Sequence, residues 1–100
     1  MHLVGDVHVG SEEADANRNT HGVDFREAAT VFGDALSVAF PDPDHSVGES
    51  RFLIIGLSAL GRVLVVSYTE VAIDVIRIIS ARAATAHERT FYEEDPDHRP

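Results

Sequence analysis

Three runs rich in β-branched residues fill most of the second half of the chain, and they restrict its fold more than any other feature. The runs cover residues 51–57, 63–69 and 73–79. Runs of this length and composition are typical of β-strands. The connections at 58–61 and 70–72 are too short for a crossover, so consecutive strands must be antiparallel. A shorter alternating run at 36–40 adds a fourth strand, and the sequence predicts a four-stranded antiparallel meander.

Residues with helical spacing lie on either side of these strands. We expect two helices before the sheet and one after it, at residues 11–22, 24–33 and 85–92. Ser11 is a candidate N-cap for the first helix. The other two helices begin with capping-box patterns, formed by Asp24 and Glu27 and by Thr85 and Glu88. The predicted fold class is therefore α+β.

The length and composition favour one compact domain. A chain of 100 residues can build one hydrophobic core but not two. We expect a single domain at residues 1–92 and an acidic tail at 93–100. No apolar run approaches the roughly 20 residues of a membrane span, and no basic residue precedes an apolar stretch at the start. A cytoplasmic protein without membrane contact is therefore expected. The chain has no cysteine, which excludes disulfides and thiolate chemistry.

Short segments between residues 21 and 93 follow one another in a distinctive order. They read His21-Gly-Val, Phe25-Arg-Glu-Ala-Ala-Thr-Val-Phe-Gly-Asp34, Phe40-Pro-Asp-Pro-Asp-His-Ser46, Gly48-Glu-Ser-Arg-Phe52, Ile55-Gly-Leu-Ser58, Gly61-Arg62, Tyr68-Thr-Glu70, Ile76-Arg-Ile-Ile-Ser-Ala-Arg82, Glu88-Arg89 and Tyr92-Glu93. No single segment is specific, but the set in this order and spacing is. On these segments the chain resembles the BrnT family of type II toxin–antitoxin systems.

This resemblance implies a fold, an activity and partners. The fold would be similar to that of the RelE toxins, in which helices flank an antiparallel sheet. The activity would be that of an endoribonuclease that uses no metal or other cofactor, and it would inhibit translation and growth. The partners would be RNA and a BrnA-like antitoxin, whose ribbon–helix–helix domain binds the promoter of the operon. The resemblance leaves open a homo-oligomer and a heterotetramer with the antitoxin.

The chain departs from the family pattern at basic positions. Thr20 stands where members usually carry a lysine, and Leu57 and Leu60 stand near a hairpin turn where further basic residues are frequent. The net charge of −9, with eight arginines and no lysine against 17 acids, also opposes the approach of a polyanion. An alternative function is therefore a catalytically weakened toxin fold that engages its antitoxin and contributes to operon repression. A third is an oligomerising α+β domain of another role.

Metal-free RNA cleavage needs cations to stabilise the charge of the transition state, and arginine suits this role because its planar fork binds phosphate oxygens bidentately. Arg77, Arg82 and Arg51 are the candidate cations. Arg77 lies within an apolar strand and needs a ligand, solvent or a carboxylate, so the alternative is an ion pair with Glu70 or Glu49. Arg82 lies near a predicted helix start, and Arg51 lies at a strand end. The alternative to phosphate binding for both is an ordinary solvated charge.

The reaction also needs a base for the 2′-hydroxyl and an acid for the leaving oxygen. Glu49 and Glu70 are carboxylates at strand ends, suited to base catalysis or to orienting an arginine. His21 has a suitable titration range, and the resemblance places it beside the position that Thr20 occupies. Its alternative role is a favourable contact with the C-terminal helix dipole. His45 lies among prolines and aspartates that favour a solvated turn, so no metal site is predicted.

Overall fold

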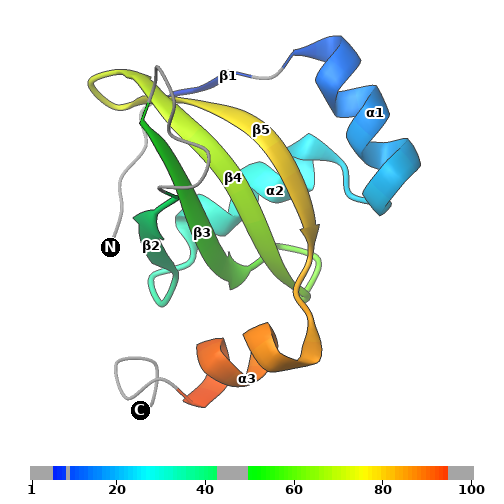
Figure 1. Cartoon of the computed structure of the whole chain (residues 1–100), viewed down its shortest axis with the longest axis vertical. Coiled ribbons are helices and arrows are strands. Elements are labelled where there is room, and N and C mark those ends of the chain that lie inside the picture. The colour runs from blue at the N-terminus through cyan, green and yellow to red at the C-terminus, as the bar shows by residue number, and fades with distance from the viewer. Residues whose placement is uncertain (1–5, 9, 43–49, 95–100) are drawn as a thin grey trace.

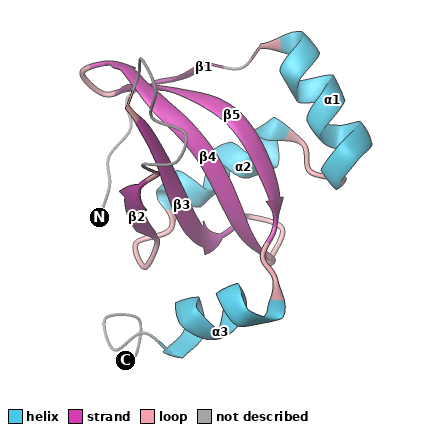
Figure 2. Cartoon of the chain, in the orientation of Figure 1, coloured by secondary structure: helices cyan, strands magenta, loops and turns pink. Residues whose placement is uncertain are grey.

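The computed structural model describes residues 6–8, 10–42 and 50–94 (Figures 1 and 2). Its elements are β1 (Asp6–His8), α1 (Ser11–His21), α2 (Phe25–Thr30), the 3₁₀ helix η1 (Val31–Gly33), β2 (Val38–Pro41), β3 (Arg51–Leu57), β4 (Val63–Ala72), β5 (Val75–Ala83) and α3 (Ala86–Glu94). The strands form one sheet in the order β1-β5-β4-β3-β2. Helix α2 lies across one face, α1 lies beside β5, and α3 follows the end of β5 (Figure 1). None of the described helices is long and apolar enough to span a membrane.

The predicted α+β class and the four-stranded antiparallel meander are confirmed. Strands β2, β3, β4 and β5 pair antiparallel in chain order, with two α-helices before them and one after. Strand β1 adds a fifth, which pairs parallel with the first residues of β5. A three-residue strand is too short to show an alternating pattern, so the sequence does not reveal it. Residues 43–49, with His45 and Glu49, lie outside the described residues, as does the tail after residue 94.

Several predicted strand boundaries are wrong. The strand predicted at 36–40 is β2, Val38–Pro41, and β5 begins at Val75 instead of Ile73. Strand β4 continues through residues 70–72, where the sequence predicts a turn, and the chain reverses at Ile73 and Asp74. Asp74 has a φ of 61°, a left-handed conformation that aspartate adopts more readily than most residues. Strand β5 runs to Ala83 instead of Ile79. Its last residues are still paired with β4, and this pairing, which depends on another strand, extends it beyond the β-branched run.

The helix starts agree with two of the three predicted caps. The Asp24 carboxylate accepts a backbone N–H of the first turn of α2 at 2.8 Å. Thr85 and Glu88 form the predicted reciprocal capping box, with hydrogen bonds of 2.9 and 3.1 Å. The N-cap of α1 is Gly10 instead of Ser11, and no side chain caps this helix.

The sheet is apolar on both faces. The α2-side core consists of Val23, Phe25, Ala28, Val31, Phe32, Ile54, Leu64, Val66, Tyr68, Ile76, Ile78 and Ala81. The other face carries a smaller α3-side cluster of Ile55, Val63, Val65, Ala84 and Tyr92. Helix α3 covers this second face only in part and leaves a groove of about 520 Å³ between itself and the strands. The groove is lined largely by the apolar side chains of Val38, Phe40, Leu53, Ile55, Val65 and Phe91.

Helix α3 makes one polar contact with strand β5 and another with Asp34, which directly follows η1. Glu88 binds the guanidinium of Arg82 through both carboxylate oxygens, at 2.6 and 2.8 Å. This contact lowers the pKa of Glu88 to about 2. Near the other end of α3, the Tyr92 hydroxyl donates to Asp34 at 2.5 Å. Burial, and then the hydrogen bond to this carboxylate, raise the pKa of Tyr92. The helix ends at Glu94, two residues later than predicted.

Helix α1 is held against β5 by the side chain of Asn17, which is only 5% exposed. Its carboxamide donates to the Ala81 carbonyl at 2.8 Å and accepts the Ala81 N–H at 3.0 Å. It also donates to the Val23 carbonyl at 2.9 Å. Strand β1 pairs with β5 only as far as Arg77, so the carboxamide satisfies backbone groups further along the edge of β5.

Glu27 joins α2 to the turn between β3 and β4. The capping box predicted for Glu27 is wrong, because its carboxylate instead accepts two hydrogen bonds from Arg62, at 2.7 and 2.6 Å, and one from Ser58 at 2.7 Å. The side chain of Glu27 is 5% exposed, so these donors replace its lost hydration. The Arg62 hydrogen bonds hold the pKa of Glu27 below its ordinary value.

We predict that Asn17→Ala lowers the free energy of unfolding by about 2–4 kcal/mol, because it leaves the Ala81 and Val23 backbone groups without their partner. Urea denaturation measures this change. Asn19→Ala, at an exposed position of the same helix, is the control and should change stability by less than about 0.5 kcal/mol. Equal effects of the two substitutions would contradict the role of Asn17.

Glu88 should contribute stability that depends on pH. Its pKa is about 2 in the folded chain, against an ordinary value of 4.5. The stabilisation is therefore complete above about pH 5 and is lost as the pH falls towards 2. Both partners are partly solvated, so we expect about 1 kcal/mol. Glutamine preserves the capping pattern, so Glu88→Gln isolates the charge.

Urea unfolding of the parent and of Glu88→Gln at several pH values tests this. The difference between the two should be largest near neutral pH and vanish near pH 2. Glu94→Gln, at an exposed position of α3, is the matched control. A difference that stays constant over this pH range would count against the Arg82 ion pair as its source.

Candidate functional site

Arg51 and Arg77 lie in one row across the sheet. Arg51 is directly opposite Thr69, and Thr69 is directly opposite Arg77. Directly opposed residues share a face, and two strand spacings separate the outer Cα atoms by roughly 10 Å. The row lies on the α3 face, since the neighbouring Tyr68 belongs to the α2-side core. Thr69 is buried and donates to the Ser50 carbonyl at 2.8 Å.

Arg77 forms an ion pair with Glu13 of α1, a residue 64 positions away in the chain. The Arg77 and Glu13 side chains are 49% and 40% exposed. An ion pair for Arg77 is therefore present, and among the described residues its partner is Glu13 and not Glu70. The helix that lies beside β5 supplies the carboxylate.

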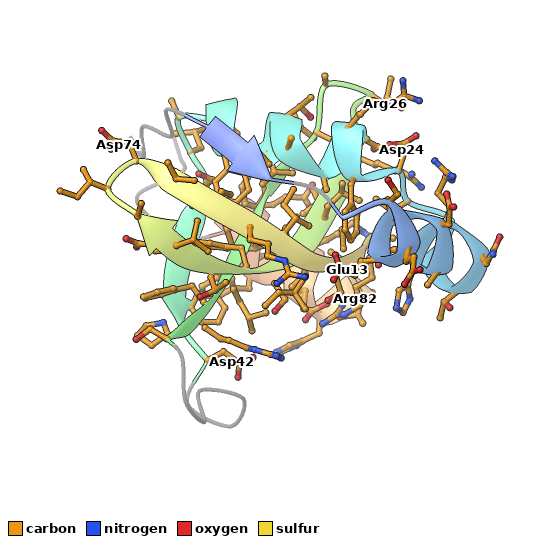
Figure 3. All side chains as sticks on the ribbon, turned by 90° about the horizontal axis from the view of Figure 1, so that it is seen from above. Glu13, Asp24, Arg26, Asp42, Asp74 and Arg82 are labelled. Atoms are coloured by element: carbon orange, nitrogen blue, oxygen red, sulfur yellow. The ribbon has the colours of Figure 1, made fainter. Side chains whose placement is uncertain are left out.

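Arg82 lies on the same face as Arg77 because of a β-bulge. The β4–β5 register shifts by one residue at Ile79. Residues five apart in a regular strand point to opposite faces, and one extra residue between them brings them to the same face. Figure 3 shows Arg82 on the side of the sheet away from α2, which carries Arg26 and is capped by Asp24. The structure thus places all three candidate arginines on one face.

The guanidinium groups of Arg77 and Arg82 are occupied to different extents. Glu88 occupies Nη1 and Nη2 of Arg82, which is the edge that would bind a phosphate bidentately. Glu13 contacts only Nη2 of Arg77. Of these two arginines, Arg77 is the one whose fork is still accessible to an anion.

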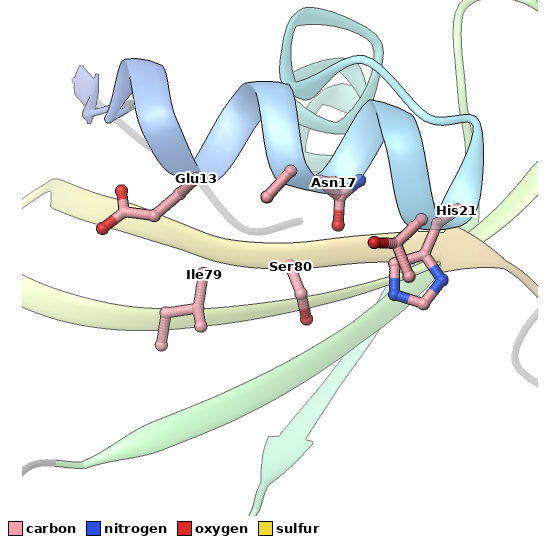
Figure 4. A pocket seen from close by; sticks show the side chains of 7 residues that line it. Glu13, Asn17, His21, Ile79 and Ser80 are labelled. Atoms are coloured by element: carbon pink, nitrogen blue, oxygen red, sulfur yellow. The ribbon is translucent and has the colours of Figure 1, made fainter.

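His21 lies in the last turn of α1, at one end of a cavity of about 240 Å³ between α1 and β5. The cavity is lined by Glu13, Ala16, Asn17, Thr20, His21, Ile79 and Ser80. Figure 4 shows Glu13, Asn17 and His21 along the side of α1 that faces β5. These residues are four apart, so they form one stripe of the helix. The stripe connects the Arg77 ion pair to the histidine.

The structure does not bring Glu70 to the arginines. Glu70 is opposite Ile76, which belongs to the α2-side core, so it lies on the other face of the sheet from Arg77. Burial and, secondarily, the negative charge of Glu70 raise the pKa of Tyr68 to about 12. This places Glu70 beside the core and away from Arg77. Glu49, the other candidate carboxylate, lies outside the described residues.

Glu13 and the ion-pairing role of Glu88 are not among the residues and roles predicted from sequence. Glu13 was visible as part of the polar stripe with Asn17 and His21, a pattern that marks a helix face with a polar neighbour. Glu88 was recognisable as a capping residue, but nothing local shows that it also binds Arg82, six residues earlier. Within the described part of the chain, no group of three or more histidine, aspartate or glutamate side chains could hold a metal ion.

A comparison with models of protein families identifies one family. A sequence model for the ribonuclease toxin BrnT of type II toxin–antitoxin systems matches residues 11–88. The crystal structure of the Brucella abortus ribonuclease toxin BrnT is similar, with a TM-score of 0.63 and 20% sequence identity over 80% of this chain and 96% of that one. At this identity the likeness shows the fold alone. A search of curated proteins finds no significant match. Because the family match covers most of its residues, the chain belongs to the BrnT family of ribonuclease toxins of type II toxin–antitoxin systems.

Proposed function

We propose that the chain is a metal-free endoribonuclease that acts in the cytoplasm, inhibits translation and growth, and binds the scissile phosphate of RNA on the α3 face of its sheet. The proposal rests mainly on one observation, the half-exposed Arg77 whose single carboxylate contact, among the described residues, uses only Nη2. An arginine in this state can still offer two parallel N–H groups to a phosphate.

Arg51 would be the second cation of this phosphate site. It lies in the same row as Arg77, with the small Thr69 between them. The two guanidinium groups are on long side chains that can converge over Thr69. Charge stabilisation of this kind is usually the largest contribution to such a reaction. Arg82 supports the site indirectly in this proposal, because Glu88 occupies its fork.

We assign proton transfer to His21 in preference to Glu70. His21 lies on the α1 stripe that also carries the partner of Arg77, whereas Glu70 lies on the opposite face of the sheet. An imidazole is suited to proton exchange near neutral pH. Glu49 remains a candidate for the same role or for orienting Arg51, near which it lies in the sequence.

A toxin of a type II system has an antitoxin partner, and we propose a BrnA-like protein with a ribbon–helix–helix domain. Exposed apolar side chains support a protein-binding surface, notably Leu60 at 76% and Leu57 at 43% exposure in the β3–β4 hairpin. Such a partner would form a heterotetramer through its own dimer, or bind a homo-oligomer of this chain.

Arg77→Ala should lower the rate of RNA cleavage by about two powers of ten, the usual cost of a lost transition-state contact. The measurement is cleavage of a labelled oligonucleotide that contains a site cut in total bacterial RNA. Arg77→Lys keeps the charge but loses the fork, so it should recover only part of the rate. Circular dichroism must show that both variants are folded. Equal cleavage by the parent and by folded Arg77→Ala would exclude this site.

A second function is favoured by the charge of the chain and by Thr20. The net charge is −9, and Thr20 lines the His21 cavity where family members usually carry a lysine. A chain that lacks this cation is suited to a role in which the toxin fold binds its antitoxin, contributes to operon repression and cuts RNA weakly.

Thr20→Lys distinguishes these two functions. If the chain is a slow ribonuclease, the new cation should raise the cleavage rate by about tenfold, which corresponds to roughly 1.4 kcal/mol. A gain is more informative than a loss, since misfolding seldom produces a gain. Absence of cleavage in both the parent and Thr20→Lys, with the parent still copurifying with a ribbon–helix–helix protein encoded beside it, would favour the binding role.

A further inference from the structure

We propose that Glu13 is a positioning residue that fixes Arg77 for the phosphate, and that Gly10 is the glycine that gives Glu13 the room to do so. The inference deepens the proposed function and rests on it, because Arg77 is the phosphate-binding residue there. Neither Glu13 nor Gly10 follows from the predicted strands, since both precede the four predicted strands in the chain.

The place of Glu13 is determined by the rigid attachment of α1. Asn17 binds the backbone of Ala81 through both its donor and its acceptor. Glu13 precedes Asn17 by four residues, and Arg77 precedes Ala81 by four residues. One helical turn rises only about 6 Å, whereas four strand residues span roughly 13 Å. The long side chains of Glu13 and Arg77 bridge the remaining distance and form an ion pair.

Gly10 leaves space for this carboxylate. A Cβ atom at position 10 would lie 1.9 Å from Oε2 and 2.8 Å from Cδ of Glu13. Any other residue at this position would push the carboxylate away from its present site. The backbone of Gly10 has φ −78° and ψ 133°, a conformation open to every residue. The need for glycine thus comes from the neighbouring carboxylate and not from the backbone.

The contacts of Glu13 indicate that it holds Arg77 and does not itself react. One of its oxygens, Oε1, binds Arg77. The other, Oε2, is buried beside Gly10 and has no hydrogen-bond partner within the described residues. With Oε1 engaged by Arg77 and Oε2 buried, neither oxygen is free to act as a base. A carboxylate with one buried, unpaired oxygen relies on its ion pair, so the Arg77 guanidinium is kept in one orientation.

Orientation of this kind has a large effect on rate. A displacement of about 1 Å in a positioned group can cost on the order of a hundredfold. Loss of the Glu13 contact should therefore reduce cleavage even though Arg77 and its charge remain. Arg82 supplies the contrast, because Glu88 occupies both of its Nη atoms, whereas Glu13 contacts Nη2 of Arg77 alone.

The test is a double-substitution cycle on the full chain with the labelled oligonucleotide described above. Glu13→Gln and Gly10→Ala should each lower the rate at saturating RNA by about ten- to a hundredfold. Since Gly10 acts only through Glu13, Gly10→Ala combined with Glu13→Gln should be no slower than Glu13→Gln alone. Glu12→Gln, an exposed neighbour on the same helix turn, should match the parent. Urea unfolding confirms that the variants are folded.

A second measurement reports on Arg77 directly. In chain labelled with ¹⁵N-arginine, the Nε–H signal of Arg77, assigned from its absence in Arg77→Lys, should be well ordered in the parent and in Glu12→Gln. It should lose this order in Glu13→Gln and in Gly10→Ala. A merely structural effect on α1 would not single out this guanidinium.

The possible results separate the two proposals. If Arg77→Ala loses activity while Glu13→Gln and Gly10→Ala match the parent, the positioning role is wrong and the proposed function stands. A faster Glu13→Gln also overturns the positioning role, because Glu13 would then compete with phosphate for Arg77. If Arg77→Ala cuts as fast as the parent, or the parent cuts no RNA, the proposed function fails and the positioning role of Glu13 fails with it.

Discussion

The two hydrogen bonds between the Asn17 carboxamide and the backbone of Ala81 fix the geometry on which the candidate site depends. They satisfy backbone groups of β5 beyond the point where β1 stops pairing. They also set the position of α1 along the strand, because a side chain that both donates to and accepts from one residue permits no sliding. The ion pair one helical turn before Asn17, and the histidine one turn after it, take their places from this attachment.

The sheet could be predicted from sequence because its evidence is local. Runs of β-branched residues and short connections are properties of neighbouring residues, and they were enough for the meander. The bulge at Ile79 is not such a property, because it exists only in the register between β4 and β5. The sequence spacing of Arg77 and Arg82 alone would put them on opposite faces of the sheet. The sequence therefore does not predict that the three arginines share one face.

The carboxylates were harder to place than the arginines for a related reason. Glu27 matches a capping pattern, yet it binds Arg62 some 35 residues later, because a buried carboxylate gains more from a guanidinium than from one backbone N–H. Glu13 likewise pairs with Arg77, which lies 64 positions later in the chain. Among the described residues, five of the acids that make the chain strongly negative are each paired with an arginine: Glu13, Asp15, Asp24, Glu27 and Glu88. An acidic protein of this kind gains little from long-range attraction to RNA, so recognition must depend on short-range geometry.

The partial cover that α3 gives to the second face has a consequence for how the chain opens. The helix is held by a charged pair at one end and a phenol–carboxylate hydrogen bond at the other, over a groove that it does not fill. Few buried apolar contacts and a dependence on ionised groups are the properties of a segment with low local stability. Helix α3 should therefore behave as a separate cooperative unit, which exchanges its amide hydrogens faster than the strands beneath it and detaches in acid while the sheet and the α2-side core remain folded.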